Sequence, residues 1–298
     1  MHDLPAPQPG EGQVRVRVEA ASINPFDSFV IKGFMKDRME HHFPLIPCSD
    51  LAGTVDMVGA GVSVFVAGDV VFGITGRMTP GGGTLAEFTS ASATTTAKRP
   101  TGLGPVEAAA LPLAGVSALM CLDAVAPKAG DVVVVIGASG GIGGYAVQLA
   151  HLAGARVVGV TSTQHVEYVQ SLGAVDVIDR ARGDVNEALR LRYPRGVAAI
   201  IDTTSDAPTL ARLAEAVASG GAVTSMRGAA TVEALAERSI RATNIRTQVT
   251  TERLEKLAGS VVAGKLKPGL VHRFELADAN RAFDMVGQGF GGKVVVSV

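Results

Sequence analysis

Apolar and charged residues alternate early in the chain. In the segment QVRVRVEA, Val14, Val16 and Val18 alternate with polar and charged neighbours, a period of two that predicts a half-buried strand. The β-rich segments GTVDMVG and GDVVFGI follow, with turn signals at residues 59–61, 68–69 and 81–83. This pattern predicts a small, irregular β-barrel.

The hydrophobic pattern changes from about residue 106 onward. Helix-length segments there separate short apolar runs, which predicts a parallel sheet with helices on both faces. After glycines 264 and 269, the last residues predict a strand, a helix and a strand that return to the first domain. We therefore expect an α/β protein with a barrel domain at 1–105 and 269–298 and a doubly wound domain at 106–268. The expected parallel strands are 132–136, 156–160, 176–178, 197–201 and 221–225.

A glycine-rich turn ends the first of these parallel strands, in VVVVIGASGGIGG at 132–144. Read as A-x-G-x-x-G, its Gly140 lets backbone approach a pyrophosphate and its Gly143 allows close packing of helix on strand. The amides at the start of the following helix favour such an anion. The alternative is a plain strand-turn-helix with tolerant glycines. The expected cofactor contacts of this turn are Ala138, Ser139, Gly140, Gly141, Ile142 and Gly143.

The second parallel strand ends in Thr161, Ser162 and Thr163, where an acid that binds the ribose hydroxyl is expected about 20 residues beyond the turn. Without a carboxylate, a 2′-phosphate is not repelled and the hydroxyls can bind it. The sequence therefore favours NADPH over NADH. His165 and Arg180 are the nearest cations, although Arg180 equally fits a solvated loop arginine.

Charge and cysteine content narrow the class of protein. The 27 basic and 28 acidic residues give a net charge of −1, which does not attract nucleic acid or an acidic membrane. Two cysteines, Cys48 and Cys121, are too few for a disulfide framework and fit a reducing cytosol. The N-terminus does not fit a secretory signal, and the apolar run Ala108 to Leu122 is shorter than the roughly 20 residues that span a bilayer. We expect a cytoplasmic protein without nucleic-acid or membrane partners.

The chain resembles the medium-chain dehydrogenase/reductase superfamily, and within it the zinc-independent, quinone-oxidoreductase-like branch. This resemblance implies a GroES-like barrel domain, a Rossmann domain and an active site in the cleft between them. Members of this family commonly form dimers that extend the Rossmann sheet across the interface, so the resemblance implies a homodimer, and we expect the β-prone segment 244–250 to lie at the contact. The resemblance is found in ASINPFDSFVIKG (21–33), PCSDLAGTVDMVGAGV (47–62), AALPLAGVSALMCL (109–122), the strand-turn-helix at 130–163, SLGAVDVID (171–179) and AIIDTTSD (199–206).

Zinc-dependent relatives hold a catalytic metal with Cys, His and Cys, and this chain has Asn24, Ser49 and Ala114 at the matching positions. These residues do not supply the thiolates and imidazole that zinc requires, so we expect no metal. The structural-zinc lobe is also absent, because the segment Ile74 to Phe88 contains no cysteine. Relatives have about 20 more residues ahead of LPAPQPGEG, which leaves two alternatives: an open barrel edge without the first strand, which a partner chain would cover, or a start codon placed too far downstream.

Without a Lewis acid, the resemblance implies hydride transfer from NADPH to a quinone or to an enone. Asn24 replaces a former metal ligand and is the expected polar group facing nicotinamide and substrate. Ser28, Ser49 and Asp50 lie in the same two motifs, although all of these side chains equally fit loop-tying roles. Asp27 is expected to be structural. The resemblance adds Ser117 and Thr203 to the cofactor contacts.

Three functions stay open at this point. The first is the quinone or enone reductase, and the second is an enoyl-thioester reductase of polyketide or fatty-acid-like metabolism. The second is less favoured, because Ser28 stands where some enoyl reductases have a tyrosine donor. The third is a non-catalytic NADPH-binding protein. The adjacent His41 and His42 fit surface residues better than ligands, with a role as proton donor left open.

Overall fold

The structure, a computed structural model, describes residues 3–76, 81–286 and 288–298. It has two compact units, Met1–Val116 with Val249–Val298, and Ser117–Gln248. The sequence pattern instead predicts domain limits after residues 105 and 268. Helix α9 (Thr251–Val262) accounts for the second difference, because it packs against β5 (Thr96–Lys98) of the first unit.

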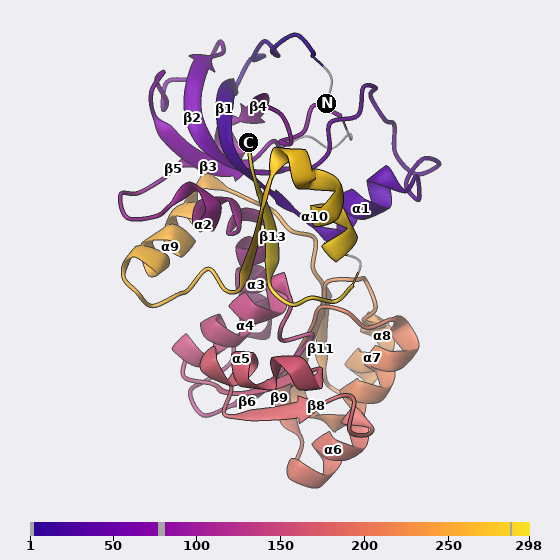
Figure 1. Ribbon diagram of the computed structural model, residues 1–298. Coiled ribbons are helices and arrows are strands. Elements are labelled where there is room, and N and C mark those ends of the chain that lie inside the picture. Colours follow the sequence, from indigo (N-terminus) through magenta and orange to yellow (C-terminus); the bar gives the residue numbers. More distant parts are fainter. Residues whose placement is uncertain (1–2, 77–80, 287) are drawn as a thin grey trace. The chain divides into compact units, whose positions relative to one another are not determined.

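Strand β1 (Gln13–Ile23) is the centre of the seven-stranded sheet of the first unit (Figure 1). It pairs in antiparallel fashion with β2 (Asp50–Val58), β4 (Phe88–Ser92) and β13 (Lys293–Ser297). The alternation predicted for β1 is confirmed, since Val14 and Val16 are fully buried in the core of this unit. The sheet order is β12 (Val271–Glu275), β13, β1, β2, β3 (Val70–Ile74), β5.

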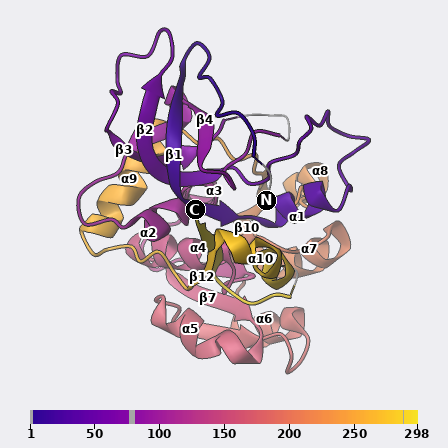
Figure 2. The same cartoon turned by 45° about the horizontal axis from the view of Figure 1, so that its top comes forward.

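Short helices complete the first unit. Helix α1 (Pro25–Ile31) follows β1 directly, and it lies beside α10 (Ala279–Val286) in both views of the ribbon (Figures 1 and 2). The strand, helix and strand predicted for the last residues are confirmed as β12, α10 and β13. The remaining elements are α2 (Pro105–Ala109), the turns η1 (Ala93–Thr95) and η4 (Leu276–Asp278), and α3 (Pro112–Val125), which contains the limit between the units.

The second unit contains the predicted parallel sheet, with all five expected strands confirmed. The order is β11 (Arg241–Asn244), β10 (Val217–Ser225), β9 (Val197–Asp202), β6 (Val132–Ile136), β7 (Arg156–Thr161), β8 (Asp176–Asp179). The chain runs from β6 to β8 in one direction and then continues on the other side of β6 with β9. Ligands of open α/β sheets bind at such a switch point, beyond the carboxyl ends of the strands.

Helices cover the two faces of this sheet. Helices α4 (Gly141–Leu152) and α5 (Val166–Ser171) contact β6, β7 and β8 on one face. Leucines of α6 (Val185–Arg192), α7 (Ala207–Leu213) and α8 (Val232–Glu237) share a core with Val134 and Val158 on the other face. The turns η2 (Thr163–His165) and η3 (Ala214–Ala216) complete the unit.

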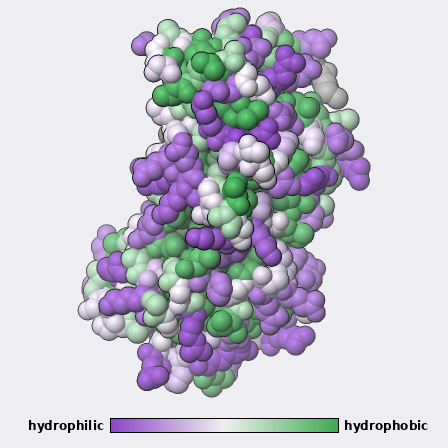
Figure 3. All heavy atoms as spheres, turned by 90° about the vertical axis from the view of Figure 1, so that its left-hand side faces the viewer, coloured by the Kyte–Doolittle hydropathy of each residue, from purple (hydrophilic) through white to green (hydrophobic). Residues whose placement is uncertain are grey.

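The segment expected at the dimer contact, 244–250, lies mostly beyond the edge strand of the sheet. The β-prone segment 244–250 contributes only Asn244 to a strand, because β11 ends there and residues 245–250 have no regular structure. Hydrophilic and hydrophobic side chains are mixed on the face that Figure 3 shows, where purple hydrophilic side chains surround small groups of green hydrophobic ones. None of the described helices is long and apolar enough to cross a membrane.

Candidate functional site

The glycine turn, residues 137–143, lies at the switch point of the second unit. Gly137 leaves β6 with φ of +76°, a conformation that favours glycine, and Gly140 caps α4 with φ of −74° and ψ of 172°. Gly140 has no side chain to cap the helix, and the first amides of an α-helix have no acceptor within it. The turn therefore presents backbone N–H donors where an anion binds favourably.

The two glycines of the motif have different reasons to be glycine. A Cβ on Gly143 would lie 2.1 Å from the carbonyl oxygen of Gly137 and 2.9 Å from Ala138 Cα, so helix and turn pack too closely for any side chain. A Cβ on Gly140 would meet only Gly137 O, at 3.4 Å, which is ordinary contact. The space above Gly140 is therefore left open by the protein itself, and it fits the pyrophosphate of a dinucleotide.

Hydroxyl groups from neighbouring strand ends surround this turn. Thr203, which follows β9, donates from Oγ1 to Ile136 O at 2.8 Å, beside Gly137. Thr161 is buried and donates to Ser139 Oγ at 2.8 Å. The structure thus brings Thr203, Ser139 and Thr161 to the glycine turn. Ser117 is fully buried, and its hydroxyl lies 2.6 Å from Thr247 Oγ1.

Strand β7 ends in hydroxyl residues, but a carboxylate from the end of the neighbouring strand β8 lies beside them. Asp179 Oδ2 accepts a hydrogen bond from Thr163 Oγ1 at 2.6 Å, and Ala181 N donates to Oδ1 at 2.9 Å. These bonds, the Thr163 one first, lower the pKa of Asp179 below its usual value, so it is ionised at neutral pH. The sequence contains a signal for this contact, because neighbouring parallel strands end at the same edge of a sheet and Asp179 ends the strand that follows β7. In the structure Thr161 pairs with Asp179.

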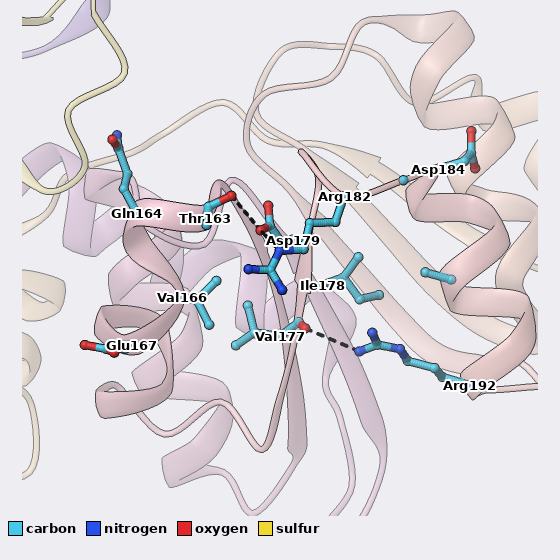
Figure 4. Close-up of a pocket in the computed structure, with 12 residues that line it drawn as sticks. Thr163, Gln164, Val166, Glu167, Val177, Ile178, Asp179, Arg182, Asp184 and Arg192 are labelled. Atoms are coloured by element: carbon cyan, nitrogen blue, oxygen red, sulfur yellow. Dashed lines mark hydrogen bonds and ion pairs between the residues drawn. The ribbon is translucent and has the colours of Figure 1, made fainter.

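Positive charge also gathers at this strand end. Arg182 Nε lies 3.1 Å from Asp179 Oδ2, and Arg180 is exposed, with its backbone N bonded to Thr161 O at 2.9 Å. Ser162 is half-buried between the two threonines. A pocket of about 640 Å³ opens here between α5 and α6 (Figure 4), lined by Thr163, Gln164, Val166, Glu167, Val177, Ile178, Asp179, Arg182, Gly183, Asp184, Ala188 and Arg192.

The first unit buries a polar cluster, defined here as Asn24, Asp27, Asp50 and Lys293. Asn24 Nδ2 donates to Asp50 Oδ2 at 2.8 Å, and Lys293 Nζ donates to Asn24 Oδ1 at 2.6 Å. Asp27 Oδ2 accepts from the backbone N of Asn24 at 2.7 Å. Strand pairing explains the meeting, because β1 ends at Ile23 between Asp50 at the start of β2 and Lys293 at the start of β13.

Burial perturbs the acids of this cluster. Desolvation raises the pKa of Asp27 from 3.8 to about 6, and it also raises the pKa of the fully buried Asp50, against which the Lys293 charge acts. Cys48 packs beside them at φ of +71°, and burial raises the pKa of its thiol. Strained backbone and shifted pKa values occur together at functional sites more often than elsewhere.

The other predicted side chains of this unit lie close by. Ser28 follows Asp27 on α1, and its buried Oγ has no hydrogen-bond partner among the described residues. Ser49 precedes Asp50 and lies 3.5 Å from Thr75 Oγ1 through its hydroxyl. Asp27 is part of the cluster, although the sequence predicts a structural role for it. Lys293 was missed; its one sequence signal is a lysine before the apolar run VVV.

The residues at the former zinc positions do not fit a zinc ion. Asn24 is engaged at both ends of its carboxamide, Ser49 is a hydroxyl, and Ala114 is a buried alanine of α3. An ammonium stands 3.5 Å from Asp50, where a second cation would be repelled. Across residues 3–76, 81–286 and 288–298, no group of three or more His, Cys, Asp or Glu side chains has a suitable arrangement for a metal.

Comparison with known proteins matches both units. Residues 10–101 match the alcohol dehydrogenase GroES-like domain, and residues 141–257 match the zinc-binding dehydrogenase family model. The chloroplast envelope quinone oxidoreductase homolog of Arabidopsis thaliana is 42% identical over 201 residues, 65% of this chain and 59% of that protein. The chloroplastic NADPH-dependent alkenal/one oxidoreductase of the same plant is 31% identical over 275 residues, 89% of this chain and 66% of that protein.

A solved structure gives the same result over the full chain. The quinone oxidoreductase from Coxiella burnetii superposes with a TM-score of 0.88 and 28% identity, covering 100% of this chain and 94% of that one. By contrast, the chain spans 59% of the length of the chloroplast envelope relative. The fold is a GroES-like domain with a Rossmann-type parallel sheet. The chain belongs to the medium-chain dehydrogenase/reductase family.

Proposed function

We propose that the chain is an NADPH-dependent, zinc-free reductase that transfers hydride to a quinone or to the β-carbon of an enone. The main support is the polar cluster at the former metal position, where Lys293, Asn24 and Asp50 form a hydrogen-bonded chain in place of metal ligands. Such a site favours acceptors that are electron-poor without a Lewis acid. The names of the Arabidopsis and Coxiella proteins describe the same acceptor classes.

The second unit would bind and orient the cofactor. The amides at the start of α4 would hold the pyrophosphate over Gly140, and Thr203 and Ser139 would border it. When bound, NADPH supplies a hydride, the two-electron reductant of the reaction. Ser162, Thr163 and Arg180 are proposed for the 2′-phosphate, with Ser117 as a further cofactor contact. The Asp179 carboxylate opposes this phosphate, and Arg180 and Arg182 offset that repulsion.

The first unit would stabilise the charge that develops on the acceptor. Hydride adds to the β-carbon, the π pair of the C=C bond moves toward the carbonyl, and the product is an enolate that then takes a proton on its α-carbon. Asn24 Nδ2 is the proposed donor to the enolate oxygen, and the unpartnered Ser28 hydroxyl is a second one. Asp50 holds the carboxamide, while Ser49 would line the same place.

The test is NADPH oxidation by the full chain with a panel of benzoquinones, enones and crotonyl-CoA. We expect turnover with a quinone or enone and, in Asn24→Ala, a kcat about 100-fold lower, the loss typical of one oxyanion donor. Preference for crotonyl-CoA would instead favour an enoyl-thioester reductase. Binding of NADPH without any turnover would reject the proposal in favour of a non-catalytic binding protein.

We also propose that the chain forms a homodimer through β11, which is an edge strand of the six-stranded sheet. Its exposed edge presents backbone groups that a second copy can pair with. Light scattering should give twice the chain mass of 30.5 kDa, and a single-chain mass at working concentrations would contradict the dimer. Cytoplasmic location stays a prediction, since the Arabidopsis relatives have chloroplast names.

A further inference from the structure

A contribution to the free energy of unfolding does not explain why Lys293 is buried. It is 5% exposed, with Nζ at 3.4 Å from Ile23 O and 3.5 Å from the fully buried Asp50 carboxylate. Desolvating both charges is so unfavourable that replacing a buried ion pair with apolar residues is often neutral or stabilising. The contact of Lys293 with Asn24, at 2.6 Å, therefore suggests a role beyond holding β13 against β1.

Lys293 and Asp50 together determine how the Asn24 carboxamide is turned. An ammonium only donates and a carboxylate only accepts, so the first must face Oδ1 and the second must face Nδ2. The flipped amide would place two donors together at one end and two acceptors together at the other. In the observed orientation one Nδ2 proton goes to Asp50, and the proposed function assigns the second to a substrate oxygen.

The ammonium also changes the strength of that donor. A positive charge that hydrogen-bonds to Oδ1 draws electron density from the amide nitrogen, and hydrogen bonds in such a chain strengthen one another in a buried environment. Asn24 is 6% exposed, so little water competes for these contacts. The Nδ2–H bond is therefore both oriented and polarised before a substrate arrives, which is the condition for efficient stabilisation of an oxyanion.

We propose that Lys293 is a positioning residue of the reductase, which acts through Asn24 by holding and polarising its carboxamide. The inference rests on the proposed function, in which Asn24 Nδ2 donates to the enolate or quinone oxygen. It assigns no proton transfer to Lys293, whose contribution is made by charge and geometry alone.

The decisive variant is Lys293→Met in the full chain, which keeps the length of the side chain and removes the ammonium. Arg99→Met is the matched control, because Arg99 forms a half-buried ion pair with Glu19 in the same unit at 3.2 Å and is 10% exposed there. We expect kcat of Lys293→Met to fall about tenfold or more with the Kd for NADPH unchanged, and Arg99→Met to keep its kcat within about twofold.

A double-substitution cycle separates positioning from a merely structural role. In an Asn24→Ala background, Lys293→Met should lower kcat by less than about twofold, because the group through which it acts is gone. The proposal is overturned if the two losses multiply, or if Lys293→Met retains the kcat of Arg99→Met. Thermal unfolding of both methionine variants shows whether they are equally folded.

A second measurement does not depend on turnover. The side-chain NH₂ signals of Asn24, assigned by their loss in Asn24→Ala, should exchange with water about tenfold faster in Lys293→Met than in Arg99→Met, because one anchor of the amide is lost. Equal exchange in both variants overturns the positioning role. Wild-type protein that reduces no acceptor would instead reject the proposed function, while the exchange result still decides the orientation of Asn24.

Discussion

The candidate site of the second unit consists of backbone groups, whereas that of the first unit consists of side chains. In the second unit, the site is made of backbone, with the glycine turn leaving the space beside Gly140 open at the start of α4. In the first unit, the site consists of side chains from the first residues of β2 and β13 and from the start of α1, and Asn24 and Lys293 are 269 positions apart in the sequence. A backbone site depends on the shape of one short segment, whereas a buried side-chain network depends on strand register and on protonation. The two sites should therefore fail under different changes.

The largest effect is expected from Gly143→Ala. Its Cβ would lie 2.1 Å from Gly137 O, so the turn or the helix must shift. We expect a loss of about 3 kcal/mol in the free energy of unfolding and a loss of NADPH affinity of about 100-fold or more. Urea unfolding and NADPH fluorescence titration measure the two effects.

Gly259→Ala is the matched control for this substitution. Nothing lies within 4 Å of its added Cβ on the exposed face of α9, so it should stabilise the protein by about 0.5–1 kcal/mol. Unchanged NADPH affinity in Gly143→Ala would contradict the role given to the glycine turn.

The next largest effect is the pH dependence of the free energy of unfolding that Asp27 of the polar cluster contributes. The folded pKa of Asp27, about 6, exceeds the 3.8 of the free group, so the native state binds more protons between these values. Stability from this group is present below pH 4 and is lost as pH rises toward 6, by up to about 3 kcal/mol. Asp50, Cys48 and Lys293 are the charged or titratable groups that face it.

Comparing wild type with Asp27→Asn by denaturant unfolding from pH 4 to pH 7.5 checks this slope. The control is Asp69→Asn, because hydrogen bonds from Val66 N and Lys98 lower the pKa of the half-buried Asp69 carboxyl, which contributes stability that is lost as pH falls. The two differences should therefore change with pH in opposite directions. A wild-type advantage over Asp27→Asn that does not vary with pH would exclude the buried protonation equilibrium.

A smaller effect is expected from Gly140→Ala, which should lower NADPH affinity without the loss of stability expected for Gly143→Ala. In Gly140→Ala the Cβ meets only Gly137 O, at 3.4 Å, and φ of −74° suits any residue, so the free energy of unfolding should stay within about 0.5 kcal/mol. The methyl group would occupy space that the pyrophosphate needs, and the Kd for NADPH should rise about 30-fold, or about 2 kcal/mol. Full affinity in this variant would place the cofactor elsewhere.

The smallest effect concerns the choice between cofactors. Asp179→Asn removes the negative charge beside Thr163, and Arg180→Ala removes a positive one from the same strand end. Exposed charges are screened, so we expect the ratio of NADPH to NADH affinity to rise about threefold in the first variant and to fall about threefold in the second. Calorimetric titration with both cofactors measures the ratio, and equal ratios in all three proteins would exclude a 2′-phosphate at this place.

Much of the fold was predictable because it follows from local pattern. Alternating valines indicate β1, and the apolar runs between helix-length segments indicate the parallel strands of the second unit. The end of β11 is not a local property, because residues 245–250 are β-prone but lie beyond the strand, and tertiary pairing decides where a strand ends.

The residues of the two sites also differ in whether the sequence alone or only the tertiary structure determines their positions. The sequence by itself determined the glycine turn, since a strand, four glycines and a helix within a few residues dictate their own backbone geometry. It also determined that thiolate and imidazole ligands are missing at Asn24, Ser49 and Ala114. Only the tertiary structure placed Asp179 beside Thr163 and Lys293 beside Asn24. Both contacts join residues at, or just beyond, the ends of neighbouring strands. Sheet order decides which strands are neighbours, and it is a property of the folded chain that no short segment specifies.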